Sequence, residues 1–244
     1  MPRDFAPGPD DLLCEQCGYA LNGLPDTGNC PECGKPIAES TTASPRRPPA
    51  WETGRDRAVG RFEFTALGVL RSPRRFFRGM TAHGDTARSA AFGRLAIAPA
   101  VVLNTKTVVM HLFIMLMTSG PPAFDPAVLA AAGVVTLVVV MLGWLGLYLA
   151  VVRLTTVESR YWKMRLPAVV VRRALHYDAV YASALSVPPW AISLAYLCLV
   201  LANDRFAVYQ VTYLYALSAS VIVAGVGLFY VYATSMRSLM YANR

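Results

Sequence analysis

The chain has 244 residues, a formal net charge of +8 and a hydrophobic content of 55%. This length allows one or two domains, and the hydrophobic content argues against a wholly soluble protein. Residues 1–60 are rich in proline, glycine and charge, whereas residues 95–234 hold long apolar runs that are typical of transmembrane helices. The positive charge suits either nucleic acid or an anionic membrane surface.

Four of the five cysteines lie near the N-terminus. Cys14, Cys17, Cys30 and Cys33 follow the pattern C-x2-C-x12-C-x2-C, which favours a metal site over a disulfide framework. Zinc prefers four tetrahedral ligands, and thiolate sulfurs bind it at about 2.3 Å. We therefore predict one structural zinc ion on these four cysteines, within a small β zinc ribbon formed by residues 1–38.

Iron is the alternative metal. The stretches C-x-x-C-G-Y and C-P-E-C-G resemble the knuckles of rubredoxin, in which four cysteines hold iron for electron transfer. Here twelve residues separate the knuckles, a much shorter insert than in rubredoxin, and this favours zinc. Free thiols persist in a reducing compartment, and residues 1–13 lack an apolar signal core, so we expect no cleaved secretory peptide.

The predicted ribbon is unsuited to nucleic acid. Residues 14–34 contain no lysine or arginine, and their charged residues are acidic. Phosphate neutralisation supplies most non-specific nucleic-acid affinity, so we expect a structural or protein-contact role instead. Gly18 and Gly34 each follow the second cysteine of a knuckle, where a left-handed backbone is often required.

The next two segments connect this module to the apolar part. Residues 39–60 are polar and proline-rich and are predicted to be a flexible linker. Residues 61–94 form a predicted basic amphipathic segment at the membrane interface, with Ser72 and Pro73 as a helix cap and first helical position. The expected lipid-facing basic patch is Arg71, Arg74, Arg75 and Arg78, opposite Phe76, Phe77 and Met80.

The apolar region predicts a helix bundle over residues 95–234, followed by a cytoplasmic tail, 235–244. Three candidate spans, 127–152, 179–202 and 206–234, contain no charged residue, and each exceeds the roughly 20 residues that cross a bilayer. The fold class is therefore mainly α, a polytopic bundle of about four spans with a small N-terminal β ribbon.

The first candidate span, 95–117, carries a possible intramembrane polar site at Asn104, Lys106 and His111. A charge near mid-membrane costs roughly 2.5–3.5 kcal/mol on insertion scales, and such residues are often functional. The other reading is a kinked helix whose polar face packs on its neighbours. Asn104 and His111 would share that face, while Lys106 points elsewhere.

The distribution of positive charge predicts the orientation. Of the 23 lysines and arginines, 21 flank the spans on one side, and the opposite loops, 118–126 and 203–205, contain only Arg205. By the positive-inside rule, both termini are expected to be cytoplasmic. Arginine outnumbers lysine 20 to 3, which suggests GC-rich coding and a bacterial source, hence the bacterial inner membrane.

Two stretches point to known families. SPRRFFRGM, followed by RRALHYDAVYASALSVPPW, resembles the Yip family of multispan membrane proteins over residues 64–234. CEQCGYALNGLP and CPECG resemble the zinc-ribbon heads of bacterial multispan proteins of unassigned role. Yip proteins usually have five spans, whereas four are counted here. The resemblance implies a membrane-organising role, since eukaryotic members assist vesicle trafficking with small GTPases.

Three functions follow as hypotheses. The first is a non-enzymatic membrane protein whose cytoplasmic ribbon recruits a protein partner or organises the membrane, with the lipid bilayer and a second copy of the chain as further partners. The second is transport or permeation along the polar face of the first span. The third is a membrane enzyme or redox protein, for which the sequence offers no metalloprotease motif, nucleophile elbow, phosphate loop or catalytic carboxylate pair. We therefore expect no catalytic residue.

Overall fold

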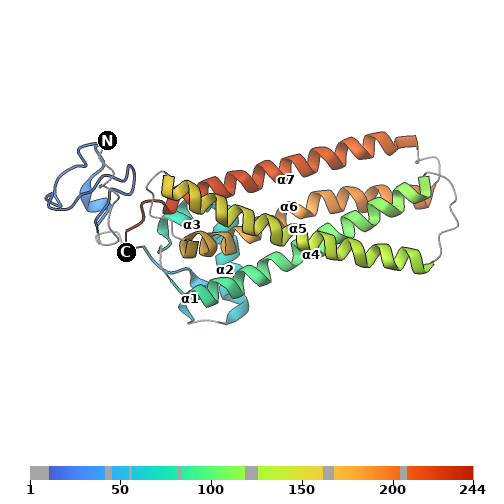
Figure 1. Cartoon of the computed structure of the whole chain (residues 1–244), viewed down its shortest axis with the longest axis horizontal. Helices are drawn as coiled ribbons and strands as arrows, with labels where there is room; N and C mark the ends of the chain where they lie inside the picture. Colours follow the sequence, from blue (N-terminus) through green and yellow to red (C-terminus); the bar gives the residue numbers. More distant parts are fainter. Residues whose placement is uncertain are drawn as a thin grey trace. The chain divides into compact units, whose positions relative to one another are not determined.

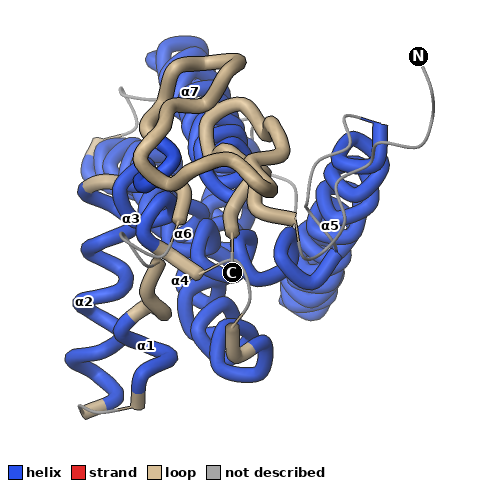
Figure 2. The backbone as a smooth tube through the Cα atoms, turned by 90° about the vertical axis from the view of Figure 1, so that its left-hand side faces the viewer, coloured by secondary structure: helices blue, strands red, loops and turns tan. Residues whose placement is uncertain are grey.

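The computed structural model describes residues 11–41, 46–54, 57–81, 84–118, 126–161, 168–203 and 208–243. These residues are mainly helical, as predicted, and contain no strand (Figure 2). The sheet expected in the ribbon is not confirmed. Its described backbone makes two isolated antiparallel bridges instead, Leu13 with Ala20 and Asn29 with Pro36, because each knuckle is too short for a longer ladder.

Along the chain, the short helices come before the long ones (Figure 1). A 3-10 turn, η1 (Ile37–Glu39), is followed by α1 (Ala50–Thr53), α2 (Ala58–Arg71) and α3 (Pro73–Gly79). The long helices are α4 (Thr86–Thr118), α5 (Pro126–Tyr161), α6 (Ala168–Ala202) and α7 (Gln210–Leu239). Ser72 and Pro73 stand at the start of α3, as predicted, although the Ser72 side chain makes no capping hydrogen bond.

Three described helices are long and apolar enough to span a membrane, as expected of an integral membrane protein: Thr86–Thr118, Val169–Ala202 and Gln210–Leu239. The apolar stretch described within α5 is Ala131–Gly143. The fourth span, expected over residues 127–152, stays a prediction. The loops expected at the outer face, 118–126 and 203–205, lie almost entirely outside the described residues.

The chain divides into two compact units. Unit 1 comprises Met1–Gly93, Ala150–Asp178 and Val231–Arg244, and unit 2 comprises Arg94–Leu149 and Ala179–Tyr230. Each long helix thus contributes one end to unit 1, and the contributed ends alternate between N- and C-terminal along the chain. In the described part of unit 2, the charged residues are Arg94 and Lys106 alone. The apolar character of the chain is therefore concentrated in unit 2.

The core of unit 1 is aromatic. The rings of Trp51, Phe62 and Phe92 contact one another, and Phe92 also contacts Tyr177. The ring centroids are 5.0 Å apart for both Phe62–Phe92 and Phe92–Tyr177. Such pairs add packing energy beyond the area they bury. Trp51 belongs to α1, inside the segment that was expected to be a flexible linker. The described residues of that segment therefore contribute side chains to a core.

A buried ion pair lies beside this aromatic core. The Arg173 guanidinium donates through Nε and Nη2 to the two carboxylate oxygens of Glu52, at 2.9 and 2.8 Å. Tyr177 donates its hydroxyl to the same carboxylate, and Arg173 also donates to the carbonyl of Thr81. The side chains of Arg173 and Glu52 are only 1% and 2% exposed. Two charges this deep are tolerated because each one neutralises the other.

Candidate metal centre

The two cysteine knuckles have the same backbone structure. In the first, Gly18 donates its N–H to the carbonyl of Cys14 at 2.8 Å; in the second, Gly34 donates to Cys30 at 2.9 Å. Gly18 and Gly34 have φ of 79° and 72°, the left-handed conformation predicted from sequence. This turn reverses the chain immediately after the second cysteine of each pair. As a result, both thiols of a knuckle face the same point.

The four sulfurs form a cluster of the size that a metal ion needs. The Sγ atoms of Cys14 and Cys33 are 3.5 Å apart, and those of Cys17 and Cys30 are 3.6 Å apart. All four Sγ atoms lie within 4.8 Å of one another. A tetrahedron with metal–sulfur bonds of about 2.3 Å has sulfur–sulfur edges of about 3.8 Å. The predicted ligand set is therefore brought together in a site able to hold one metal ion, and four thiolates fit zinc.

The electrostatics of the cluster also favour a cation. Burial raises the pKa of the Cys14 thiol, but the backbone N–H groups of Cys17 and Gln16 outweigh it and lower that pKa to about 7. Burial and the neighbouring sulfurs raise the pKa of Cys17 to about 12. Four like charges cannot share so small a volume unaided. A divalent ion at the centre would compensate them and supply the folding energy of the module.

The module has a small apolar core of its own. Cys14, Leu21, Cys30 and Ile37 are buried together, at exposures of 0–2%. Leu21 follows the first knuckle, and Ile37, from η1, covers the second. A core of this size is too small to fold a chain segment alone. A metal ion bound by the four thiolates would therefore supply much of the stability of residues 11–41.

The C-terminal tail holds the ribbon through Asn243. Its side-chain amide donates to the carbonyls of Leu13 and Ser40 at 2.8 and 2.7 Å, and its Oδ1 accepts the Leu13 N–H at 3.0 Å. Tyr241 packs against the first knuckle so closely that a Cβ on Gly18 would lie 2.5 Å from its ring. The ribbon is therefore docked on the tail at the first knuckle.

A second attachment runs through Glu15. Arg46 donates to both of its carboxylate oxygens, at 2.8 and 3.0 Å, and also to the carbonyl of Ser238, at 3.2 Å. Arg46 additionally donates to the carbonyls of Phe77 and Met80 at the end of α3. One guanidinium thus connects the ribbon, α3 and the end of α7. No local pattern indicates this role, because Arg46 lies among prolines in the expected linker.

The predicted basic patch is exposed. Arg71, at the end of α2, and Arg74, Arg75 and Arg78, in α3, all have exposed side chains, while Phe77 and Met80 are buried at 0% and 2%. The two-sided character of α3 is as expected. The apolar side, however, packs on the protein, where Phe76 contacts Phe77 and Tyr177. Contact of the arginines with lipid stays a prediction.

The predicted intramembrane polar residues, Asn104, Lys106 and His111, are separated by the structure. Asn104 donates its amide to the Ser186 hydroxyl of α6 at 2.9 Å and to the Ala100 carbonyl at 2.9 Å. His111 Nδ1 lies 3.0 Å from the Tyr213 hydroxyl of α7. Lys106 is exposed on the surface of α4. Asn104 and His111 therefore connect helices within unit 2, and the lysine takes no part.

One polar residue of unit 2 was not singled out from sequence. Ser183 of α6 donates its hydroxyl to the carbonyl of Ala96 and accepts the N–H of Ala100 at 3.1 Å. Pro99 lies inside α4 between those two residues, and a proline weakens the helix ladder there. The bond that Pro99 cannot make is the one to the Leu95 carbonyl. The Ser183 hydroxyl bridges the next pair along the ladder, the Ala96 carbonyl and the Ala100 N–H. The one sequence feature that could have indicated a polar partner at this position is Pro99 in α4.

No family model, no curated protein and no solved structure matches the chain. The site is therefore defined by its own geometry: a four-cysteine cluster able to bind one metal ion, in a chain whose described residues include three helices that can span a membrane.

Proposed function

We propose that this chain is a non-enzymatic integral membrane protein whose zinc ribbon faces the cytoplasm and recruits a protein partner to the membrane. The four-cysteine cluster on a chain with membrane-capable helices carries this proposal. Zinc fits because the cluster has four thiol ligands and no open position for a substrate, as structural zinc sites do. The ribbon then serves as a rigid binding surface.

The docking of the ribbon supports this role. Asn243 and Arg46 hold it at Leu13, Glu15 and Ser40, so its remaining surface is presented in a fixed orientation on unit 1. A rigid surface loses less conformational entropy on binding than a tethered one. The exposed charged residues of the described ribbon are Asp26, Glu32 and Glu39. All three are acidic, and a partner with a basic segment would complement them.

The orientation and location are part of the proposal. Both termini would be cytoplasmic, in a bacterial inner membrane, since 21 of 23 lysines and arginines flank the predicted spans on one side. A fourth span through α5 completes this topology. The resemblance to the Yip family is likewise proposed, on SPRRFFRGM and RRALHYDAVYASALSVPPW. A membrane-organising role would follow from it by analogy alone.

The permeation alternative draws less support from the structure. It requires Asn104, Lys106 and His111 to line one path. Asn104 and His111 are instead engaged with Ser186 and Tyr213. Polar groups that satisfy each other between helices stabilise packing and leave no water-lined surface on those side chains.

Protein crosslinking in intact cells tests the recruiting function. The full chain, tagged at its N-terminus, is compared with an Asp26→Lys/Glu32→Lys variant, and the crosslinked proteins are quantified by mass spectrometry. Glu63→Lys/Glu158→Lys is the matched control, because these exposed carboxylates lie in α2 and α5. Both variants should retain their metal.

We expect at least one protein to be enriched with the wild type and the control but depleted at least tenfold with the ribbon variant. If every crosslinked protein responds equally to the two charge reversals, the ribbon is not a recruiting surface.

A further inference from the structure

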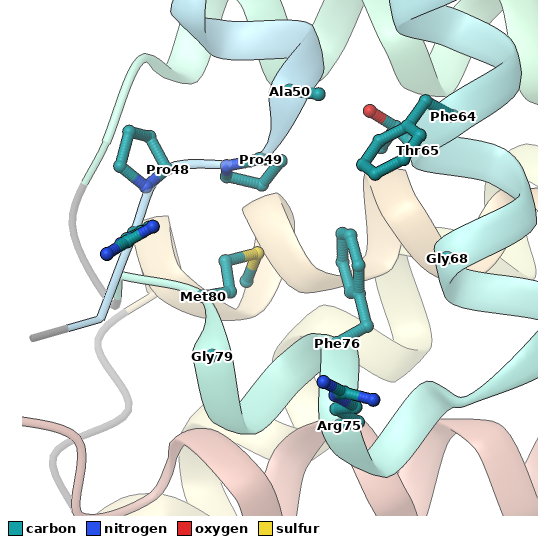
Figure 3. Close-up of a pocket in the computed structure, with 11 residues that line it drawn as sticks. Pro48, Pro49, Ala50, Phe64, Thr65, Gly68, Arg75, Phe76, Gly79 and Met80 are labelled. Atoms are coloured by element: carbon teal, nitrogen blue, oxygen red, sulfur yellow. The ribbon is translucent and has the colours of Figure 1, made fainter. Parts of the chain in front are cut away.

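A pocket of about 420 Å³ opens in unit 1 between α1, α2 and α3 (Figure 3). Its volume falls within the range of roughly 300–1,000 Å³ that is usual for small-molecule sites. The ring of Phe76 rises from α3 into the space between Met80 and Phe64 (Figure 3). Pro48 and Pro49 close the opposite wall. The metal centre and the proposed recruiting function make no use of this pocket.

The wall of the pocket is mainly apolar. Besides the prolines and the two phenylalanines, it is lined by Ala50, Gly68, Gly79 and Met80. The one neutral polar side chain is Thr65, which is buried and accepts the backbone N–H of Trp51 at 3.1 Å. The backbone N–H of Arg47 is bonded to the Gly79 carbonyl. The pocket therefore offers little polar surface to a hydrophilic molecule or to an extended peptide.

Two cations stand among the lining residues. Arg47 and Arg75 have exposed side chains, and within the described residues neither forms an ion pair with a carboxylate. The paired carboxylates of unit 1 are engaged elsewhere: Glu15 with Arg46, Glu52 with Arg173, and Asp85 with Arg88. An apolar cavity with unpaired guanidinium groups is complementary to an anionic amphiphile.

We propose that this pocket binds one anionic phospholipid. An acyl chain fills the apolar space around Phe76, and the phosphate lies between the guanidinium groups of Arg47 and Arg75. The bilayer is the source of the lipid, because Gly79 is only seven residues before α4 begins at Thr86, a distance of at most roughly 25 Å along the chain.

Lipid retention by the purified full chain tests this site. Native mass spectrometry in detergent measures binding of dioleoyl phosphatidylglycerol, dioleoyl phosphatidylcholine and glycerol 3-phosphate. Arg47→Gln/Arg75→Gln removes both pocket cations, and Arg74→Gln/Arg78→Gln is the matched control, with the same loss of charge on exposed residues outside the pocket. An arginine that contacts the headgroup of an anionic lipid contributes about a fivefold effect on its binding.

We expect the wild type and the control to retain one phosphatidylglycerol in preference to phosphatidylcholine, and the pocket variant to bind it roughly 25-fold more weakly. Equal binding of both lipids, equal loss in both double variants, or unchanged binding in the pocket variant would each overturn the proposal. Binding of glycerol 3-phosphate as tight as that of the lipid would identify a free-anion site instead.

A second variant tests the apolar part alone. Ala50→Phe places a ring in the pocket and leaves both arginines unchanged, so we expect phosphatidylglycerol retention to fall at least tenfold. Gly79→Leu fills the pocket from its other side. The fold should accept this change, because a Cβ at Gly79 meets no atom within 4 Å. If both variants fold, as judged by an unchanged midpoint of denaturant unfolding, and bind lipid normally, no acyl chain occupies the pocket. Because none of these changes touches the ribbon surface, failure here would leave the recruiting function standing.

Discussion

Gly18 meets two separate constraints, and Gly34, its equivalent in the second knuckle, meets one. Both have positive φ, but only at Gly18 would a Cβ collide with another side chain, the ring of Tyr241. A left-handed conformation costs an alanine about 1–2 kcal/mol. Since metal binding and folding of the ribbon are coupled, this cost should appear in the metal affinity.

Gly34→Ala should therefore weaken zinc binding by roughly 5- to 30-fold, and Gly18→Ala should weaken it further, because the ribbon must also leave the tail. Competition with a chromogenic chelator measures both affinities on the full chain. Equal affinities for the two variants would mean that Tyr241 is not packed on the first knuckle in solution.

The metal itself can be counted. The purified protein should be colourless and contain about one zinc per chain, because four thiolates form one tetrahedral site. Cys14→Ser should abolish metal binding, whereas Cys198→Ser should have no effect, since Cys198 is an exposed residue of α6 outside the cluster. Elemental analysis of the three proteins gives the result, and iron in the wild type would contradict the zinc assignment.

The buried pair Glu52–Arg173 should behave as one unit. Removing either partner leaves an uncompensated buried charge, so Glu52→Ala and Arg173→Met should each destabilise unit 1 by about 3–5 kcal/mol. The double variant Glu52→Leu/Arg173→Met removes both charges and should recover most of that loss. Denaturant unfolding followed by the fluorescence of Trp51, which lies in the adjoining core, measures the difference. Additive losses in the double variant would show that the two side chains are not paired.

At the scale of elements, a residue of α6 compensates for the proline inside α4. In Ser183→Ala, the Ala100 N–H and the Ala96 carbonyl lose their shared partner, and interhelical hydrogen bonds of this kind contribute about 0.6 kcal/mol, at most about 1.7. Pro99→Ala should make the serine dispensable, because without the proline ring the helix can straighten and Ala100 can bond Ala96 directly. A double-mutant cycle on thermal stability in detergent tests this coupling. A coupling energy of zero would separate the serine from the proline.

The local features of the fold were predictable from sequence, and the distant contacts were not. The knuckles and the start of α3 were found because their signals lie within a few residues: paired cysteines with a following glycine, and Ser72 before Pro73. α1 has only four residues, too few to show a helical period, so its segment was expected to be a linker. The partners Glu52 and Arg173 are 121 residues apart, and no local pattern connects them.

The same distinction holds within the candidate site. The four ligands follow from spacing alone, since tetrahedral coordination demands two close pairs. Docking of the ribbon depends on Asn243, which is 230 residues from Leu13 and has nothing unusual in its own surroundings. The polar face of α4 was recognised from Asn104 and His111. Their partners, Ser186 and Tyr213, are common helix residues that become informative only once the helices are placed together.

The molecule as a whole should cross the membrane an even number of times. Reporter fusions at residues 1, 122, 165, 204 and 244 should alternate in, out, in, out, in, because 21 of 23 basic residues flank the spans on one side. Paired alkaline phosphatase and fluorescent protein fusions measure each position. If residues 122 and 165 report the same side, α5 does not span the membrane and the topology has three crossings.

The docking of the ribbon on Asn243 has a consequence for biosynthesis. Leu13 is synthesised 230 residues before its partner, Asn243. At a translation rate of about 5–20 residues per second, this separation is a delay of roughly 10–50 s. The ribbon can acquire its metal during that time, but it cannot dock until α7 has been translated. A ribosome that stalls earlier therefore leaves an undocked ribbon with the Tyr241 side of its first knuckle uncovered. Such a surface is uncovered in every chain that ends before Tyr241.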